Sequence, residues 1–250
     1  MYPILGRLPN ILVYSYTVVW GVTILLAAGL IFWQNRKQPQ LKGWFDGLLA
    51  ILLGAIVGGR AGFIWANQSY FAEHPNKISE IFAGGLLYHG ALGGGLLCFW
   101  LWTRLTKRPF APYATLLTPA ILVAHTAGWL ACLLEGCAYG RATFLNWYTA
   151  DLPDSYGVYA IRYPTQFMGI MLCLLLTAAI VRWGPTNGRR FWLALAGLNL
   201  IHGLLTFWRG DTIPLIMGIR SDLFLAAVIS VFALAMTFLT PRPQRQSRLL

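Results

Sequence analysis

Charged side chains, and acidic ones above all, are scarce in this sequence. Only 11% of its 250 residues are Asp, Glu, Lys or Arg, against about 25% in soluble domains. A soluble fold of this size would therefore lack the charge to cover its surface. Intrinsic disorder is also excluded, because disordered chains are rich in charge and poor in aromatic residues, whereas this chain has 11 Trp, 14 Phe and 11 Tyr.

Paired cysteines at zinc-binding spacing are also lacking. The four cysteines are Cys98, Cys132, Cys137 and Cys173, and they form no C-x-x-C pairs, so the sequence gives no zinc pattern. Cys98 and Cys173 lie in apolar runs and are interpreted as small hydrophobic residues. We expect no metal site and no cofactor. No internal repeat is evident either, so the inverted repeat of many transporters is not visible.

Long apolar runs are what the sequence has in abundance, and 57% of its residues are hydrophobic. Each run is close to the ~20 residues that cross a bilayer. The first run is too long and begins too late for the core of a signal peptide, so we keep it as a helix. The pattern predicts an all-α integral membrane protein, a bundle of seven transmembrane helices that forms one domain over residues 1–250. The predicted spans are about 11–33, 44–66, 86–103, 113–135, 165–183, 191–208 and 216–239.

The basic residues predict the orientation of this bundle. Twelve of the nineteen Lys and Arg residues, and no acidic residue, lie in the segments 34–43, 104–112, 182–190 and 240–250. With seven spans, these four segments all fall on one side, and Lys and Arg mark the cytoplasmic side. We therefore expect the N-terminus outside and the C-terminus in the cytoplasm. This placement favours topology over nucleic-acid binding as the reason for the net charge of +11.

The predicted outer loop 136–164 is long and rich in aromatic and polar residues. Loops of this length without clear structure are often functional. Trp and Tyr also favour the membrane interface, so an interfacial anchor is an equally good interpretation of the loop.

Polar residues inside predicted spans are expensive and mark functional sites. Nearly all of them lie in the outer half of the bilayer, which predicts a polar cavity open to the outer side rather than a pore. The sequence alone also allows some of them to reach the interface as snorkelling side chains. The residues in or beside this layer include Arg60, His89, His125, Glu135, Gln166, His202, Arg209, Arg220 and Asp222.

Helical spacing groups some of these residues. His202, Thr206 and Arg209 share one helix face, and so do His125, Trp129 and Cys132. We favour a site at His202, whereas His125 is equally well explained as a packing residue. Small-residue stripes, Gly54-Gly58-Gly62 and Gly90-Gly94, predict close packing of the second and third spans.

Five stretches together resemble the prolipoprotein diacylglyceryl transferase family. They occur in the family's order and cover most of the chain. They are GGRAG at 58–62, GGLLYHG at 84–90, GCAYGRAT at 136–143, RYPTQ at 162–166 and FWRGD at 207–211.

The resemblance implies an enzyme that transfers a diacylglyceryl group from phosphatidylglycerol to the cysteine thiol of a prolipoprotein. It implies membrane lipids and the signal-peptide region of the prolipoprotein as partners, and no nucleic acid. It places the protein as a multi-pass protein at the outer face of the bacterial plasma (inner) membrane. On this basis His89 and Arg141 are the candidate catalytic residues. The candidate substrate-binding residues are Arg60, Glu135, Tyr139, Gln166, His202 and Arg209.

The sequence departs from the family at several charged positions. The central motif that begins Gly-Arg-x-Gly-Asn in the family is GWLAC here, and Trp129, Cys132, Cys137, Tyr163 and Thr206 stand at family site positions. One interpretation is a rewired site, in which His202, Arg209, Arg141 and Glu135 take over the charged roles. The other is a divergent member that acts in lipid binding, transport or thiol redox chemistry without this transferase activity. In that case Cys132 and Cys137 are candidates for a redox pair.

Overall fold

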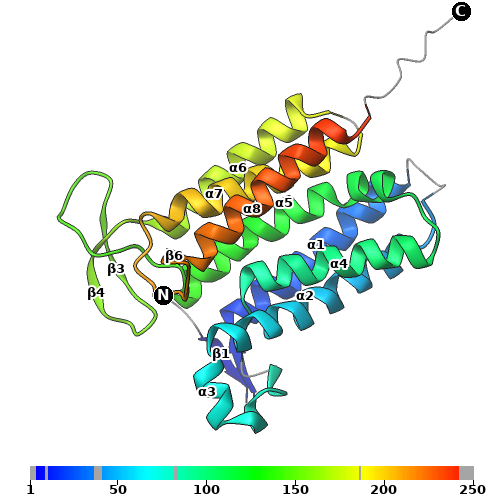
Figure 1. Cartoon of the computed structure of the whole chain (residues 1–250). Helices are drawn as coiled ribbons and strands as arrows, with labels where there is room; N and C mark the ends of the chain where they lie inside the picture. Colours follow the sequence, from blue (N-terminus) through cyan, green and yellow to red (C-terminus); the bar gives the residue numbers. More distant parts are fainter. Residues whose placement is uncertain (1–3, 9–10, 37–40, 82–83, 186, 242–250) are drawn as a thin grey trace, which may run out of the picture.

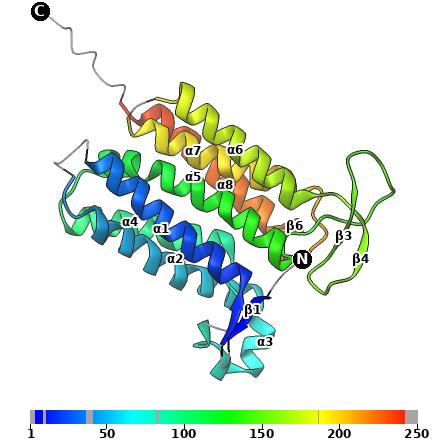
Figure 2. The same cartoon turned by 180° about the vertical axis from the view of Figure 1, so that it is seen from behind.

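A long helix covers each of the seven predicted apolar runs. The computed structural model describes residues 4–8, 11–36, 41–81, 84–185 and 187–241, and the chain forms one helical bundle (Figures 1 and 2). The helices are α1 (Ser15–Asn35), α2 (Trp44–Ala66), α4 (Tyr88–Leu105), α5 (Phe110–Glu135), α6 (Thr165–Trp183), α7 (Arg189–Thr206) and α8 (Ser221–Leu239). Short helical segments, α3 (Gln68–Glu73) and η1 (Pro75–Lys77), lie between α2 and α4.

Five of these helices are long and apolar enough to cross a membrane, namely α1, α2, α5, α6 and α8. This agrees with the prediction of an integral membrane helical protein. The other two are more polar: α4 contains Gly93–Gly95 and Arg104, and α7 contains Asn199 and His202. Both pack against other helices of the bundle, α4 along α2 and α7 against α5, α6 and α8. Protein neighbours therefore bury Asn199 and His202 of α7, whereas Arg104 of α4 stays exposed.

Glycines allow α2 and α4 to approach closely. A Cβ atom at Gly58 would collide with the carbonyl oxygen of Gly90, and one at Gly54 would collide with that of Gly94. The amide of Leu87 also donates to the Gly59 carbonyl at 2.9 Å. The predicted small-residue packing of these two helices is thus confirmed.

The two ends of the bundle differ in structure. One end carries β1, α3 and the β3–β4 hairpin, whereas α8 ends at the other (Figures 1 and 2). At that second end the basic segments contact their neighbours: Arg108 donates to the Tyr113 hydroxyl, which donates to the Lys42 carbonyl, and Arg189 donates to the Thr237 carbonyl. The described parts of the basic segments therefore gather at one end, as predicted.

The structure contains three two-stranded antiparallel hairpins, and the first and last of them correct the predicted starts of two helices. They are β1 (Ile4–Leu8) with β2 (Ile11–Tyr14), β3 (Ala150–Pro153) with β4 (Tyr159–Arg162), and β5 (Leu215–Ile216) with β6 (Ile219–Arg220).

The first and last helices therefore begin later than predicted, at Ser15 and Ser221 instead of about 11 and 216. A short apolar run does not distinguish a strand from a helix end. The turn of the last hairpin, Met217 and Gly218, has φ values of +51° and +78°. Two successive positive φ angles are typical of the tight turn that joins twisted strands.

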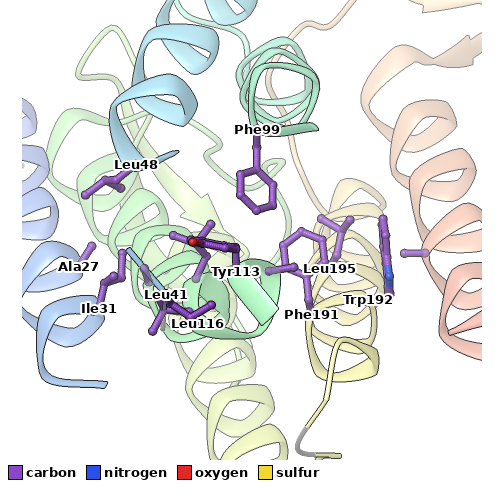
Figure 3. Packing of buried hydrophobic residues seen from close by; sticks show 14 of the residues in the cluster. Ala27, Ile31, Leu41, Leu48, Phe99, Tyr113, Leu116, Phe191, Trp192 and Leu195 are labelled. Carbon is purple, nitrogen blue, oxygen red and sulfur yellow. The ribbon is translucent and has the colours of Figure 1, made fainter. Parts of the chain in front are cut away.

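The end of the bundle with the basic segments has an apolar core. Figure 3 shows its side chains meeting between the helices. Ile31 of α1, Phe99 of α4 and Phe191 of α7 are each 1% exposed, and Arg108 lies over the rings of Trp102 and Tyr113, which belong to or pack against this cluster. The polar residues singled out in the sequence lie toward the opposite end, which makes that end the location of the candidate site.

Candidate functional site

Aromatic rings from three helices meet around His202 of α7. Tyr88 of α4 stacks on the His202 ring with centroids 4.5 Å apart, and His89 meets it edge-on at 5.0 Å. From α5, Trp129 lies 5.7 Å and His125 lies 6.4 Å from His202, measured between ring centroids. The structure thus brings three predicted polar positions together, and adds Tyr88, which the sequence analysis did not select although it directly precedes His89.

Two histidines of this ring cluster have a nitrogen without a partner. In the described part of the chain, neither His89 Nε2 nor His125 Nε2 makes a hydrogen bond, and both atoms are buried. Such unsatisfied buried atoms are uncommon in folded proteins and are often explained by function. His89, which is 6% exposed, thus has a buried ring nitrogen with unused hydrogen-bonding capacity.

A charged network connects the ring cluster to the end of the bundle. Arg209 Nη1 lies 3.2 Å from His202 Nε2 and 3.3 Å from Asp222 Oδ2. Arg209 also pairs with Asp211, and Arg220 contacts Asp211 and Asp222 at 3.3 and 3.1 Å. The predicted shared face of His202 and Arg209 is confirmed. Two carboxylates, Asp211 and Asp222, neutralise this arginine, a pairing that spacing within α7 does not predict.

Arg60 is engaged by backbone atoms. Its guanidinium donates to the carbonyl oxygens of Lys77, Ile78 and Gly84, at 2.5, 3.1 and 2.7 Å. These bonds hold the segment that leads into α4. In the described residues, no hydrogen bond or ring contact joins His89 to Arg60 or Arg141.

Arg141 is the exposed arginine of the site region. Its guanidinium carbon lies 5.5 Å from the centroid of the Tyr163 ring, and its amide donates to the Trp208 carbonyl at 2.8 Å. The hydrogen bond with the Thr143 hydroxyl lowers the pKa of the Tyr163 phenol, burial opposes this, and Arg141 lowers it further. Arg141 thus has a fixed backbone and an exposed side chain that contacts Tyr163.

The remaining candidates lie around the loop that follows α5. Gln166 is buried and donates to the Cys137 carbonyl at 3.0 Å. The Tyr139 ring lies 5.0 Å from the guanidinium of Arg162. Glu135 is exposed and lines a cavity of about 350 Å³ with residues 153–157 and Tyr159.

Arg162 anchors the β3–β4 hairpin. It pairs with Asp154 at 3.0 Å and donates to the carbonyls of Leu152 and Gly140 at 3.2 and 3.3 Å. Burial acts to raise the pKa of the Asp154 carboxyl, but hydrogen bonds from the Val158 and Tyr156 amides, together with Arg162, lower it. Loop 136–164 is therefore partly ordered, although Trp147 and Tyr156 are 95% and 88% exposed.

A second cavity, of about 440 Å³, opens beside Arg60. Phe63, Asn67, Tyr70, Phe71, Lys77 and Glu80 line it together with Gly84 and Gly85. His89 does not, so this cavity and the ring cluster are separate features.

Cys132 and Cys137 form a disulfide bond, which the spacing alone had left open. Cys98 is a free, half-buried cysteine and Cys173 is free and buried, as expected of small hydrophobic residues. Among the described residues, no group of three or more His, Cys, Asp or Glu side chains is arranged to hold a metal ion.

Comparison with known proteins gives a consistent result. A family model described as prolipoprotein diacylglyceryl transferase matches residues 3–239. A relative from Corynebacterium efficiens is 28% identical over 92% of this chain and 77% of its own length, and one from Corynebacterium glutamicum is 29% identical over 94% and 80%. A relative from Geobacter sulfurreducens is 34% identical over 66% of this chain and 64% of its own length. All three are named phosphatidylglycerol–prolipoprotein diacylglyceryl transferase.

Proposed function

Because the chain belongs to the prolipoprotein diacylglyceryl transferase family, we propose that it transfers a diacylglyceryl group from phosphatidylglycerol to a prolipoprotein cysteine. The observation that carries this proposal is the match over nearly the whole chain, from residue 3 to residue 239. The relatives' names supply the donor and the acceptor.

The reaction requires a thiolate and a phosphate leaving group. The acceptor sulfur attacks the glyceryl carbon that bears the phosphate. A C–S bond forms, the C–O bond breaks, and glycerol phosphate leaves with the bonding pair. A base takes the thiol proton, since the thiolate is the nucleophilic form of cysteine.

His89 is the base in this proposal. Its buried Nε2 has no partner among the described residues, and a bound thiol would supply one. His89 packs against the ring of His202. This ring is held in place by its neighbours Tyr88, Trp129 and His125. General bases must lie within hydrogen-bond reach of the proton that they remove, and this rigid setting would keep the imidazole in place.

Arg141 is the phosphate-binding residue in this proposal. A guanidinium matches two phosphate oxygens with parallel N–H donors. Arg141 makes no salt bridge in the described part of the chain and is exposed. Arg209 and Arg162, by contrast, are paired with carboxylates. In this proposal Arg60 and Gln166 shape the site through the backbone carbonyls that they bind.

The other candidates receive narrower roles. Arg209 orients His202 through the 3.2 Å contact, and Tyr139 packs beneath Arg162 at the base of the hairpin. Glu135 lies at the mouth of the cavity that the hairpin covers, where it is placed to meet the polar part of an acceptor peptide. Each is thus a substrate-binding or positioning residue.

The proposed topology has seven spans, with the N-terminus outside and the C-terminus in the cytoplasm. The gathering of basic residues near Lys42, Arg108 and Arg189 at one end supports it, since basic residues mark the cytoplasmic side. The hairpins and the ring cluster then lie toward the outer leaflet, where a lipid and the signal-peptide region of a prolipoprotein would arrive. The proposed location is the bacterial inner membrane.

Complementation tests this function in cells. Bacteria depleted of their own transferase would express the parent chain or its His89→Gln variant, with equal membrane levels checked by immunoblot. Growth and lipoprotein maturation with the parent but not with the variant would support the proposal. A parent chain that is present in the membrane but restores neither would contradict it.

A further inference from the structure

The Cys132–Cys137 disulfide joins the last turn of α5 to the loop that follows it. The two Cα atoms are 4.6 Å apart, and Gly136 between them adopts a left-handed conformation with φ of +97°. Both cysteines are half-buried, and Cys132 packs beside the apolar cluster that contains Trp129 and Cys173. In the proposed topology this end of α5 faces the outer side, where disulfides form and persist.

Hydrogen bonds hold this turn independently of the S–S bond. The Gly136 amide donates to the Cys132 carbonyl at 2.8 Å. From α6, Gln166 donates to the Cys137 carbonyl and the Thr165 hydroxyl to the Ala138 carbonyl, at 3.0 and 2.7 Å. Opening the disulfide would therefore leave the two sulfur atoms close together, ready to pair again.

The disulfide closes a very short loop. A cross-link restrains the unfolded chain more strongly as the loop that it closes becomes longer, and here the partners are five residues apart. Its contribution to stability is accordingly smaller than that of a cross-link that closes a long loop. A disulfide whose turn is also held by hydrogen bonds can open without loss of the fold, as a redox-active pair must.

We propose that the Cys132–Cys137 pair exchanges disulfides with dithiol proteins outside the membrane. A partner thiolate attacks one sulfur, the Cys132–Cys137 bond breaks, and a mixed disulfide forms. The partner's second thiolate then displaces the bound cysteine. The partner gains a disulfide and loses two electrons, while Cys132 and Cys137 gain those electrons and each take up a proton. This activity does not rest on diacylglyceryl transfer.

The test uses the purified full-length protein in detergent, without oxygen, and a synthetic peptide with two reduced cysteines. The expected result is one peptide disulfide per protein, found by mass spectrometry, with Cys132 and Cys137 becoming reactive to a maleimide mass tag. Cys98→Ser, which leaves the pair intact, should behave like the parent. The variants Cys132→Ser and Cys137→Ser should form no peptide disulfide.

A peptide that stays reduced beside an intact Cys132–Cys137 bond would overturn the proposal, and so would equal oxidation by the double Cys132→Ser/Cys137→Ser variant. Thermal unfolding provides a second readout. The reduced protein should stay folded, because hydrogen bonds already hold the turn, and should melt about 4–8 °C below the oxidised one, the shift expected for this loop length in a chain of this size. Loss of the folded state on reduction would show a structural disulfide and would also contradict the proposal.

Discussion

Removing the charge of Asp222 should destabilise the protein strongly. Asp222 is 4% exposed and contacts Arg209 at 3.3 Å and Arg220 at 3.1 Å. Breaking a buried ion pair by removing one partner costs about 3–5 kcal/mol, because the remaining charge is left buried without compensation. In the Asp222→Asn variant, Asp211 still contacts both arginines. We therefore expect the free energy of unfolding to fall by about 3 kcal/mol, the lower end of that range.

The measurement is the free energy of unfolding in mixed micelles, followed by tryptophan fluorescence. Glu80→Gln is the matched control, because it removes an ion pair on the surface of the protein. The two side chains of this pair, Lys77 and Glu80, are 42% and 44% exposed. Exposed pairs contribute little, so this variant should unfold like the parent. If Asp222→Asn unfolds as the control does, the charged network does not stabilise the junction of α7 and α8.

Three further changes test other parts of the structure. His89→Gln should lower the transfer rate by at least about a hundredfold, the usual contribution of a general base. His74→Gln, at the exposed end of α3, should leave the rate unchanged. Equal rates for the two variants would contradict the role of His89. Arg141→Lys should lower transfer by about tenfold through the loss of one charge-assisted hydrogen bond, and an unchanged rate at limiting phosphatidylglycerol would refute phosphate binding there. Gly58→Ala should cost up to about 3 kcal/mol of unfolding free energy through the clash with the Gly90 carbonyl, whereas Gly93→Ala, with open space around it, should cost nothing.

The helices were predictable because their cause is local. An apolar run of about twenty residues is a property of the sequence itself, and each of the seven runs became a helix with bounds shifted by a few residues. The strands at Ile11–Tyr14 and Leu215–Ile216 were not predictable in the same way, because their pairing depends on a partner strand and a turn.

The site was predictable only where one helix determines it. The contact of His202 with Arg209 follows from helical spacing, and it is present. The stacking of Tyr88 on His202 depends on how α4 and α7 pack, which no spacing within either helix determines. Arg60 shows the same limit: the sequence identifies a buried arginine, but only the fold shows that backbone carbonyls satisfy it.

The departures from the family pattern have a physical counterpart in the structure. Trp129 and His202 fill the middle of the site region with rings, and Cys132 and Cys137 are joined by a disulfide. In the proposed function, His89 and Arg141 are the groups that bind the proton and the phosphate.

Mass spectrometry of the transfer reaction tests the central claim most directly. The purified protein would be incubated with phosphatidylglycerol and a prolipoprotein, with an acceptor whose cysteine is changed to serine as the control. We predict that the prolipoprotein gains the mass of one diacylglyceryl group at its cysteine and that the serine acceptor gains nothing. An unmodified prolipoprotein in the presence of folded, lipid-bound protein would contradict the claim.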